Sequence, residues 1–261
     1  MREIGLEERK KLQLDILLDV ASFCEKHGIT YFLSSGTLLG AVRHQGYIPW
    51  DDDIDIMMPR PDYERFFALY NSSKYYAVDS FRDNEFPYHM AKIIDTQTFL
   101  KEKRRSYHKL GVHIDLFPLD GVNIERWKSH LHIVEFYEYI RNAKCTCVSD
   151  FSNVWKRICY RLLQAFLSVY SKRWLACKIR ECLMKYSWET SEYVSSLASW
   201  SEKYPILKSN FDKGVSVWFE GKQYNAPMGY DNWLKLIYGN YMQLPPEEKR
   251  ILGHAVTAFY K

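Results

Sequence analysis

The sequence predicts an α/β (α+β) fold with a mixed sheet core and a helical insertion or second half. Two observations favour this class. In the first 124 residues, short β-branched and aromatic segments alternate with helical patterns, as in elements that share one sheet. From residue 125, apolar residues recur at helical spacing over long stretches instead. We therefore expect three parts with soft boundaries: residues 1–124 as the core that carries the site, 125–190 as a basic helical segment, and 191–261 completing the same domain.

The individual elements follow from apolar spacing and from the residues that end each segment. Apolar residues between Leu12 and Cys24 recur every three or four positions, and Gly28 is a typical helix end. Before residue 124 we expect further helices at 37–42 and 62–70, and strands at 29–34, 53–58, 76–81, 90–96 and 112–117, the last closed by Pro118. Beyond it we expect helices at 125–144, 154–170, 172–186 and 231–238, and strands at 193–199 and 215–219.

Length and composition exclude several classes of protein. A chain of 261 residues that is 47% hydrophobic can bury a substantial core, so it is not a disordered protein. Six cysteines are too few for a disulfide-stapled scaffold, and we expect them to stay reduced. The first residues lack the apolar stretch of a signal peptide, and no window of about 18 apolar residues would span a bilayer. We therefore expect a cytoplasmic protein.

The net charge of +4 is distributed unevenly along the chain. Residues 1–140 carry a net −4, residues 141–186 carry +8, and the remainder is balanced. Within 154–186 the cations lie among Trp, Tyr and Leu, which suits peripheral contact with an anionic membrane. The alternative is a solvated helical hairpin whose apolar side packs on the core. No nucleic-acid-binding module accompanies the charge, so we expect no nucleic-acid partner.

The most informative stretch is acidic and runs over residues 51–56, DDDIDI. Four carboxylates within five residues repel one another and resist burial unless a cation neutralises them. In a strand, residues i and i+2 share a face, so Asp53 and Asp55 should point one way while Ile54 and Ile56 pack into the core. Two hard oxygen ligands side by side suit Mg²⁺ or Mn²⁺. A solvated acidic turn is the alternative; a Ca²⁺ loop is excluded, because Ile56 stands where glycine is needed.

Three further segments contribute candidate residues. Gly36 and Thr37 lie at a strand-to-helix junction, where free backbone N–H groups and the helix dipole attract phosphate. Arg43, at the far end of that helix, is placed to contact a phosphate oxygen, although a surface role fits as well. Asp115 is an acid within an apolar strand. It is a candidate for a third metal ligand or for the group that takes a hydroxyl proton, and the alternative is that it caps the turn at Pro118.

Two long motifs, GTLLGAVR at residues 36–43 and GYIPWDDDIDI at 46–56, resemble the signature of the LicD family. This family includes bacterial phosphocholine transferases and is related to the fukutin-type transferases. Similarity continues at 91–93, 113–121 and 238–242, and it is weakest over 125–190. The resemblance implies a nucleotidyltransferase-like fold with catalytic and metal-binding carboxylates at Asp53, Asp55 and Asp115, and with a phosphate turn at Gly36 and Thr37.

The resemblance also implies a phosphotransferase that depends on Mg²⁺ or Mn²⁺. It would move phosphocholine from CDP-choline to a sugar hydroxyl and release CMP. The acceptor would be a glycan or lipid-linked glycan of lipopolysaccharide, teichoic acid or capsule. Alternatives are transfer of another CDP-linked phospho-alditol or phosphoethanolamine, an Asp-x-Asp glycosyltransferase, and an inactive scaffold of envelope assembly. A choline group would need aromatic faces. Candidates, each with core packing as the alternative, are Tyr47, Trp50, Trp218, Tyr224, Tyr230 and Trp233.

Overall fold

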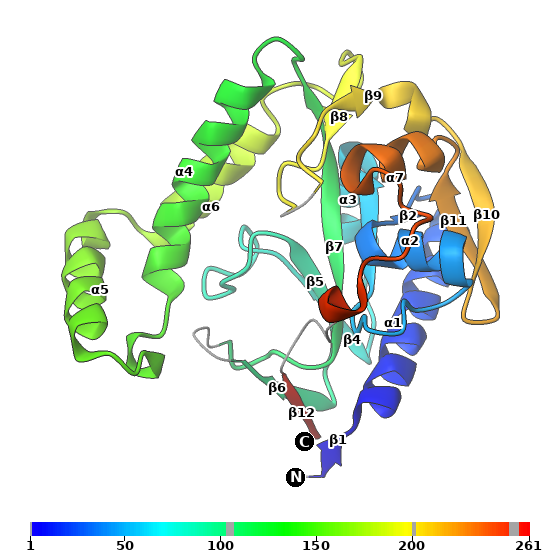
Figure 1. Cartoon of the computed structure of the whole chain (residues 1–261). Helices are drawn as coiled ribbons and strands as arrows, with labels where there is room; N and C mark the ends of the chain where they lie inside the picture. Colours follow the sequence, from blue (N-terminus) through cyan, green and yellow to red (C-terminus); the bar gives the residue numbers. More distant parts are fainter. Residues whose placement is uncertain (1, 103–106, 200–201, 251–255) are drawn as a thin grey trace.

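The structure, a computed structural model, describes residues 2–102, 107–199, 202–250 and 256–261. Within these residues a seven-stranded mixed sheet forms the centre of the molecule (Figure 1). Its main path has the order β2-β3-β7-β5-β4, and β8 and β9 extend it from the end of β7. β3 and β7 are parallel, and the other neighbours are antiparallel. The mixed α/β fold class is confirmed. The strands are β2 (Phe32–Leu33), β3 (Asp55–Pro59), β4 (Tyr75–Val78), β5 (Ala91–Asp95), β7 (His113–Val122), β8 (Tyr193–Ser195) and β9 (Ile206–Leu207).

Three helices contact this sheet, namely α1 (Leu6–His27), α2 (Ser35–His44) and α3 (Arg60–Leu69), and α7 (Tyr230–Tyr238) packs on α2. α1 ends as predicted at Gly28, whose φ of 60° is left-handed and whose N–H bonds the last helical carbonyls. α1 and α3 pack on each other where the Phe23 ring meets Phe66 and Tyr70 edge to face.

Two smaller sheets complete the core. β10 (Gly214–Phe219) and β11 (Lys222–Pro227) form a hairpin whose two turn residues, Glu220 and Gly221, both have positive φ, as tight hairpins require. β12 (Thr257–Tyr260) lies between β1 (Glu3–Ile4) and β6 (Thr98–Lys101), so the two ends of the chain meet. Short 3₁₀ helices are η1 (Val148–Asp150), η2 (Leu167–Val169), η3 (Lys208–Phe211) and η4 (Glu247–Lys249).

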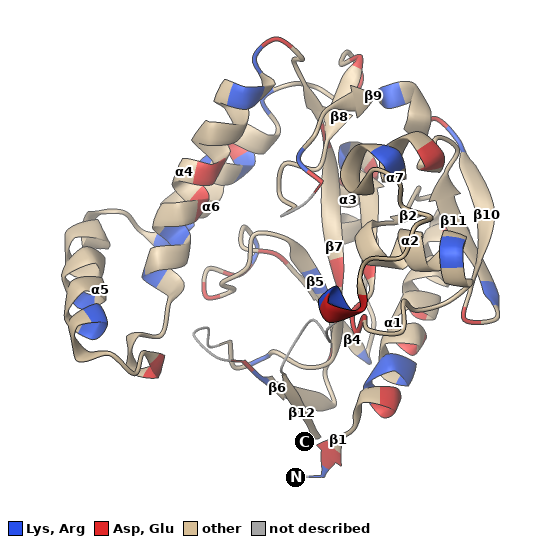
Figure 2. Cartoon of the chain, in the orientation of Figure 1, with Lys and Arg blue, Asp and Glu red and all other residues tan. Residues whose placement is uncertain are grey.

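The hydrophobic core divides along the same lines. The main cluster joins residues of the early strands to Val194, Phe211 and Trp233 from the last third of the chain. Two smaller clusters hold together α4 (Trp127–Cys145), α5 (Val154–Phe166) and α6 (Lys172–Leu183). α4 and α6 lie side by side, and α5 is the helix farthest from the sheet (Figure 1). The only charged positions along α5 are Lys and Arg (Figure 2).

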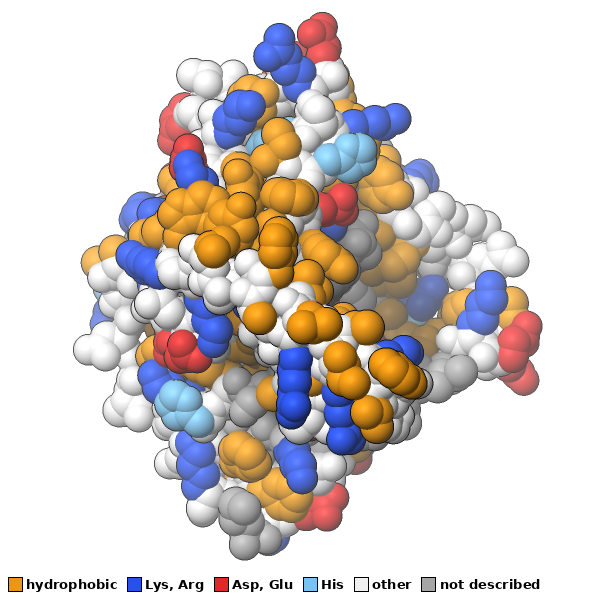
Figure 3. Space-filling view, turned by 90° about the vertical axis from the view of Figure 1, so that its left-hand side faces the viewer, with side chains coloured by type: hydrophobic (Ala, Val, Ile, Leu, Met, Phe, Trp, Pro, Cys, Tyr) orange, Lys and Arg blue, Asp and Glu red, His pale blue; other side chains and the backbone are white. Residues whose placement is uncertain are grey.

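The apolar side of α5 does not pack on the protein, so the hairpin alternative is wrong on this point. Trp155, Leu162 and Phe166 are 76%, 66% and 77% exposed, and the inward side holds Leu163 and Gln164 instead. Figure 3 shows hydrophobic side chains gathered on this side of the molecule. In the part of the chain described, each helix is too short or too polar to cross a membrane.

Several predicted boundaries are wrong. β7 does not end at Pro118 but continues to Val122. Proline has no N–H to donate, but Leu116 is the last residue of β7 that pairs with β5, so no hydrogen bond to β5 is lost at Pro118. β3 begins at Asp55, so Asp53 precedes the strand. The predicted helix 154–170 is divided into α5 and η2. The short strands β1, β6, β9, β11 and β12 were not predicted.

Candidate functional site

The acidic stretch and Asp115 meet at the start of two parallel strands. Asp55 of β3 stands opposite Asp115 of β7, and the Asp115 N–H donates to the Ile54 carbonyl at 2.8 Å. Ile54 is fully buried, whereas Asp53 and Asp55 are half-buried. The predicted alternation therefore holds, and pairing of the two strands brings the three predicted carboxylate residues to one end of the sheet.

Negative charge accumulates around Asp55. Burial raises the pKa of Asp55 well above its ordinary value, and the Asp53 and Asp115 carboxylates raise it further, in that order. Glu202 and Asp51 act in the same direction. Such an excess of hard oxygen donors is what a divalent cation balances, so the chemistry of this donor set fits Mg²⁺ or Mn²⁺.

One of these carboxylates already has a cationic partner. Lys92 lies on β5 directly opposite Asp115, and its Nζ donates to Asp115 Oδ1 at 2.6 Å and to His113 Nε2 at 2.8 Å. His113 Nδ1 donates to the Gly111 carbonyl at 2.7 Å, so Nε2 is the acceptor of the Lys92 bond. Burial, and then Lys92, lower the pKa of His113 to about 4, so the ring is neutral.

This pairing bears on the predicted metal ligands. Among the described residues, no group of three or more His, Cys, Asp or Glu side chains is arranged to hold a metal ion. Asp53 and Asp55 remain a pair of donors, while Asp115 is hydrogen-bonded to Lys92. The role of Lys92 was missed from sequence, where it appears only within the 91–93 similarity. A cation next to the apolar residues Ala91, Ile93 and Ile94 was the available signal.

The N-terminus of α2 faces another buried acid. Glu202 accepts hydrogen bonds from Ser34 Oγ at 2.5 Å and from the Ser35 N–H at 2.8 Å. A carboxylate at this end of a helix interacts favourably with the helix dipole. The Ser35 N–H is therefore already hydrogen-bonded to Glu202. Of the two residues of the predicted phosphate turn, Gly36 is half-buried and Thr37 is buried. No sequence signal pointed to Glu202, which is 168 residues from Ser34.

Gly36 and Thr37 both lie against the acidic stretch. The Thr37 hydroxyl accepts a hydrogen bond from the Asp55 N–H at 2.9 Å, which ties α2 to the start of β3. A Cβ atom on Gly36 would stand 2.3 Å from Asp51 Oδ2, so a larger residue there would displace that carboxylate from its present position. The two motif segments are thus in direct contact.

Asp52 points away from its acidic neighbours. It is 3% exposed and forms an ion pair with Arg9 of α1, while the Gln13 side chain donates to its carbonyl at 3.2 Å. For this carboxylate the neutralising cation comes from the protein itself. The expectation that these carboxylates resist burial unless a cation neutralises them therefore holds for Asp52, with Arg9 as the cation.

Arg43 connects α2 to the segment that follows α7. Its Nη1 donates to the Tyr241 carbonyl at 2.6 Å, and burial lowers its pKa. Its contact with a phosphate stays a prediction.

Of the six aromatic candidates, Trp233 and Tyr224 are buried in the main core, so core packing is their role. Trp218 is 51% exposed on β10.

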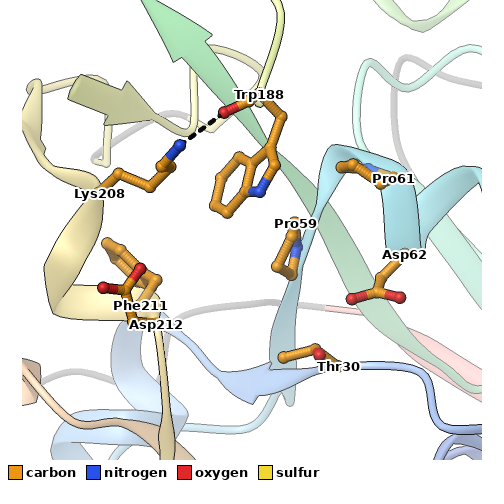
Figure 4. A pocket seen from close by; sticks show the side chains of 8 residues that line it. All are labelled: Thr30, Pro59, Pro61, Asp62, Trp188, Lys208, Phe211 and Asp212. Carbon is orange, nitrogen blue, oxygen red and sulfur yellow. Dashed lines mark hydrogen bonds between the residues drawn. The ribbon is translucent and has the colours of Figure 1, made fainter. Parts of the chain in front are cut away.

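A pocket of about 220 Å³ lies at the opposite end of β3 (Figure 4). Pro59 and Trp188 line it, and the Lys208 side chain beside them donates to the Trp188 carbonyl at 2.9 Å. None of the predicted site residues lines this pocket. It is therefore separate from the carboxylates, which lie where β3 begins.

Comparisons with known proteins show similarity over part of the chain and over nearly all of it. A family model described as LicD/FKTN/FKRP, nucleotidyltransferase domain, matches residues 28–144, from before β2 to the end of α4. The chain is 29% identical over 267 residues to "Lipopolysaccharide cholinephosphotransferase LicD" of Haemophilus influenzae, covering 99% of each protein. Thus one similarity extends well beyond the matched domain and includes the helical segment.

A second relative shares only part of the chain. "Ribitol 5-phosphate transferase FKRP" of Homo sapiens is 32% identical over 124 residues, which are 46% of this chain and 23% of that protein. Both named relatives transfer a phosphate-linked group. With the family match, these similarities show that residues 28–144 resemble the LicD/FKTN/FKRP nucleotidyltransferase domain and that nearly the whole chain resembles a lipopolysaccharide cholinephosphotransferase.

Proposed function

We propose that this protein is a metal-dependent phosphotransferase that moves phosphocholine from CDP-choline to a sugar hydroxyl of a cell-surface glycan and releases CMP. The observation that carries the proposal is similarity over 99% of the chain to a lipopolysaccharide cholinephosphotransferase. The meeting of Asp53, Asp55 and Asp115 at the start of two parallel strands supports it.

The proposed roles follow from the contacts of each residue. Asp53 and Asp55 would hold Mg²⁺ or Mn²⁺, with Asp115 as a third ligand if it exchanges its bond to Lys92 for the metal. When bound, the ion would neutralise negative charge on the donor diphosphate. The first turn of α2 at Gly36 and Thr37 favours the same phosphates through its N–H groups and dipole. Arg43, in the last turn of α2, is a further candidate for a phosphate contact.

Asp115 also suits the acceptor. Lys92 donates to Asp115 Oδ1, and among the described residues Oδ2 has no hydrogen-bond partner. Oδ2 can therefore accept a hydrogen bond from the sugar hydroxyl and take its proton as the hydroxyl oxygen bonds to phosphorus and CMP leaves. The reaction then depends on positioning and charge rather than on a covalent intermediate.

The donor is tested by incubating the protein with Mg²⁺, a glycan acceptor and single nucleotide-linked donors, and measuring released nucleotide. CMP release from CDP-choline is expected. Release only from CDP-ribitol would favour the second candidate, which the similarity to the ribitol 5-phosphate transferase supports. Release from UDP-glucose alone would indicate a glycosyltransferase, and no release from any donor would favour an inactive scaffold.

The metal pair is tested by Asp53→Asn and Asp55→Asn. Each substitution keeps the side-chain shape but removes a charged oxygen ligand, so we expect CMP release to fall by at least about 10³-fold with the circular dichroism spectrum unchanged. Asp212→Asn, an exposed aspartate near β10, is the matched control and should keep wild-type turnover. Near-normal turnover by either site variant in saturating Mg²⁺ would contradict the assignment.

A further inference from the structure

The side of α5 that faces solvent is the apolar one. Viewed down the helix at 100° per residue, Val154, Trp155, Ile158, Leu162 and Phe166 fall within one arc of about 120°. We call this set the α5 apolar face; its members are between 42% and 77% exposed. A surface helix normally turns such a face to the core. Here α5 has no buried residue, and its apolar face is exposed to solvent instead of packing on other described residues.

Positive charge borders this face. On the same helical projection, Arg161 lies about 20° beyond one edge of the arc, whereas Lys156 lies about 80° beyond the other edge, beside Leu163. Neither side chain makes an ion pair or hydrogen bond with the described residues, and the Lys156 N–H donates to Asn153 Oδ1 at 3.1 Å. Residues 151–180 contain seven Lys or Arg and no Asp or Glu. Apolar residues between flanking cations are the pattern of a helix that lies in the plane of a membrane surface.

The same charge argues against a second copy of this chain as the occupant. A symmetric dimer formed through this face would bring the two sets of cations together, and like charges repel at short distance. An anionic lipid surface instead supplies complementary negative charge that attracts each nearby Lys or Arg. α5 has 13 residues, about 20 Å, which is long enough to lie in the interface and too short to cross it.

We propose that the α5 apolar face docks this protein on the surface of an anionic lipid bilayer, with Trp155, Leu162 and Phe166 in the acyl–headgroup boundary and Lys156 and Arg161 at the headgroups. This proposal goes beyond transfer chemistry and does not rest on it. Binding to vesicles and release of CMP are separate measurements, so each proposal can fail alone.

The test is co-sedimentation of the full chain with vesicles of phosphatidylglycerol and phosphatidylcholine at low and high salt. We expect binding to anionic vesicles at low salt, weaker binding at high salt as charges are screened, and little binding to pure phosphatidylcholine. Leu162→Glu should weaken binding about tenfold or more, because it places a charge in the apolar boundary. Leu69→Glu, at an exposed leucine of α3, is the matched control and should bind as wild type.

The charge contribution is tested separately. Lys156→Glu/Arg161→Glu should lose most of the salt-dependent binding, whereas Lys213→Glu/Lys222→Glu, with the same change in net charge at exposed positions away from α5, should retain it. No binding of the wild type at low salt, or equal binding by Leu162→Glu, would overturn the proposal. So would a lipid-free dimer that Leu162→Glu abolishes in sedimentation velocity, since the face would then be covered by a second copy.

Discussion

At the scale of single residues, the site depends on polar side chains that hydrogen-bond to its backbone and to its acidic side chains. Thr37 lies in α2 but bonds the backbone of β3, and Glu202 satisfies donors at the start of α2 from the distant part of the chain. Lys92, on the neighbouring strand, donates a hydrogen bond to the Asp115 side chain and so holds it in place. The positions of the acidic residues are thus set by partners that are themselves buried or half-buried.

Thr37 provides a direct test of this support. Thr37→Val keeps the shape but removes the acceptor of the Asp55 N–H, so we expect a loss of about 1–3 kcal/mol in the free energy of unfolding. Thr37→Ser keeps the hydroxyl and should lose less. Urea denaturation measures both, and equal stability of wild type and the valine variant would show that the bond is unimportant.

Glu138 of α4 predicts a pH dependence. Burial raises its pKa to about 7, Glu135 adds to the shift, and Lys203 and Arg141 oppose it. Since the folded pKa exceeds the ordinary value of 4.5, the folded state binds more protons between these values, and stability should fall as pH rises from about 5 to 8.

Glu138→Gln should remove this fall. Between pH 5 and pH 8 the wild type is expected to lose up to roughly 3 kcal/mol more than the glutamine variant. Glu125→Gln, at an exposed glutamate before α4, is the control and should follow the wild type. Parallel stability–pH curves for wild type and Glu138→Gln would contradict the prediction.

At the scale of elements, parallel pairing of β3 with β7 decides where the site lies. The sequence predicts each strand and the face on which its acids lie, but not which strand neighbours which. Pro118 was interpreted as the end of a strand, yet β7 continues to Asp120, and Arg60 at the start of α3 binds Asp120 through Nε at 2.6 Å and Nη2 at 2.8 Å. This bidentate pair fixes α3 to the end of β7.

Breaking this pair should be costly. Arg60 is 8% and Asp120 1% exposed, so Arg60→Met leaves the Asp120 carboxylate buried without its cation, at about 3–5 kcal/mol of stability. Asp120→Asn should cost less, because the asparagine oxygen still accepts and Glu64 still pairs with Arg60. Lys235→Met, which breaks the exposed Lys235–Asp231 pair of α7, is the control and should cost less than about 1 kcal/mol. Chemical denaturation compares the three variants, and equal losses would refute the distinction.

At the scale of the whole molecule, the two ends of the chain meet in one small sheet. Ala258 of β12 is 1% exposed and stands opposite Ile4 on one side and Leu100 on the other. The early strands and the last third of the chain also share one hydrophobic core. The helices α4, α5 and α6 contribute to two smaller clusters, one of which also contains Val122 of β7, Leu197 and Ala198.

Ala258→Asp tests the closing strand. It places an unpaired carboxylate between two buried side chains, so we expect a loss of at least about 2–3 kcal/mol and a lower melting temperature. Thr257→Asp, at the exposed neighbouring position, should change stability by less than about 0.5 kcal/mol. Similar melting temperatures for the two variants would show that β12 does not stabilise the fold.

The sequence by itself determined the local features: the helix that ends at Gly28, the alternation of acids and isoleucines at 53–56, the family motifs and the amphipathic pattern of residues 154–166. Only the tertiary structure decided that Lys92 holds Asp115, that Glu202 lies at the start of α2, and that the apolar side of α5 faces solvent. The physical reason is range. Periodicity specifies which residues share a face, whereas the partner that covers that face, or leaves it exposed, depends on contacts between segments far apart in the chain.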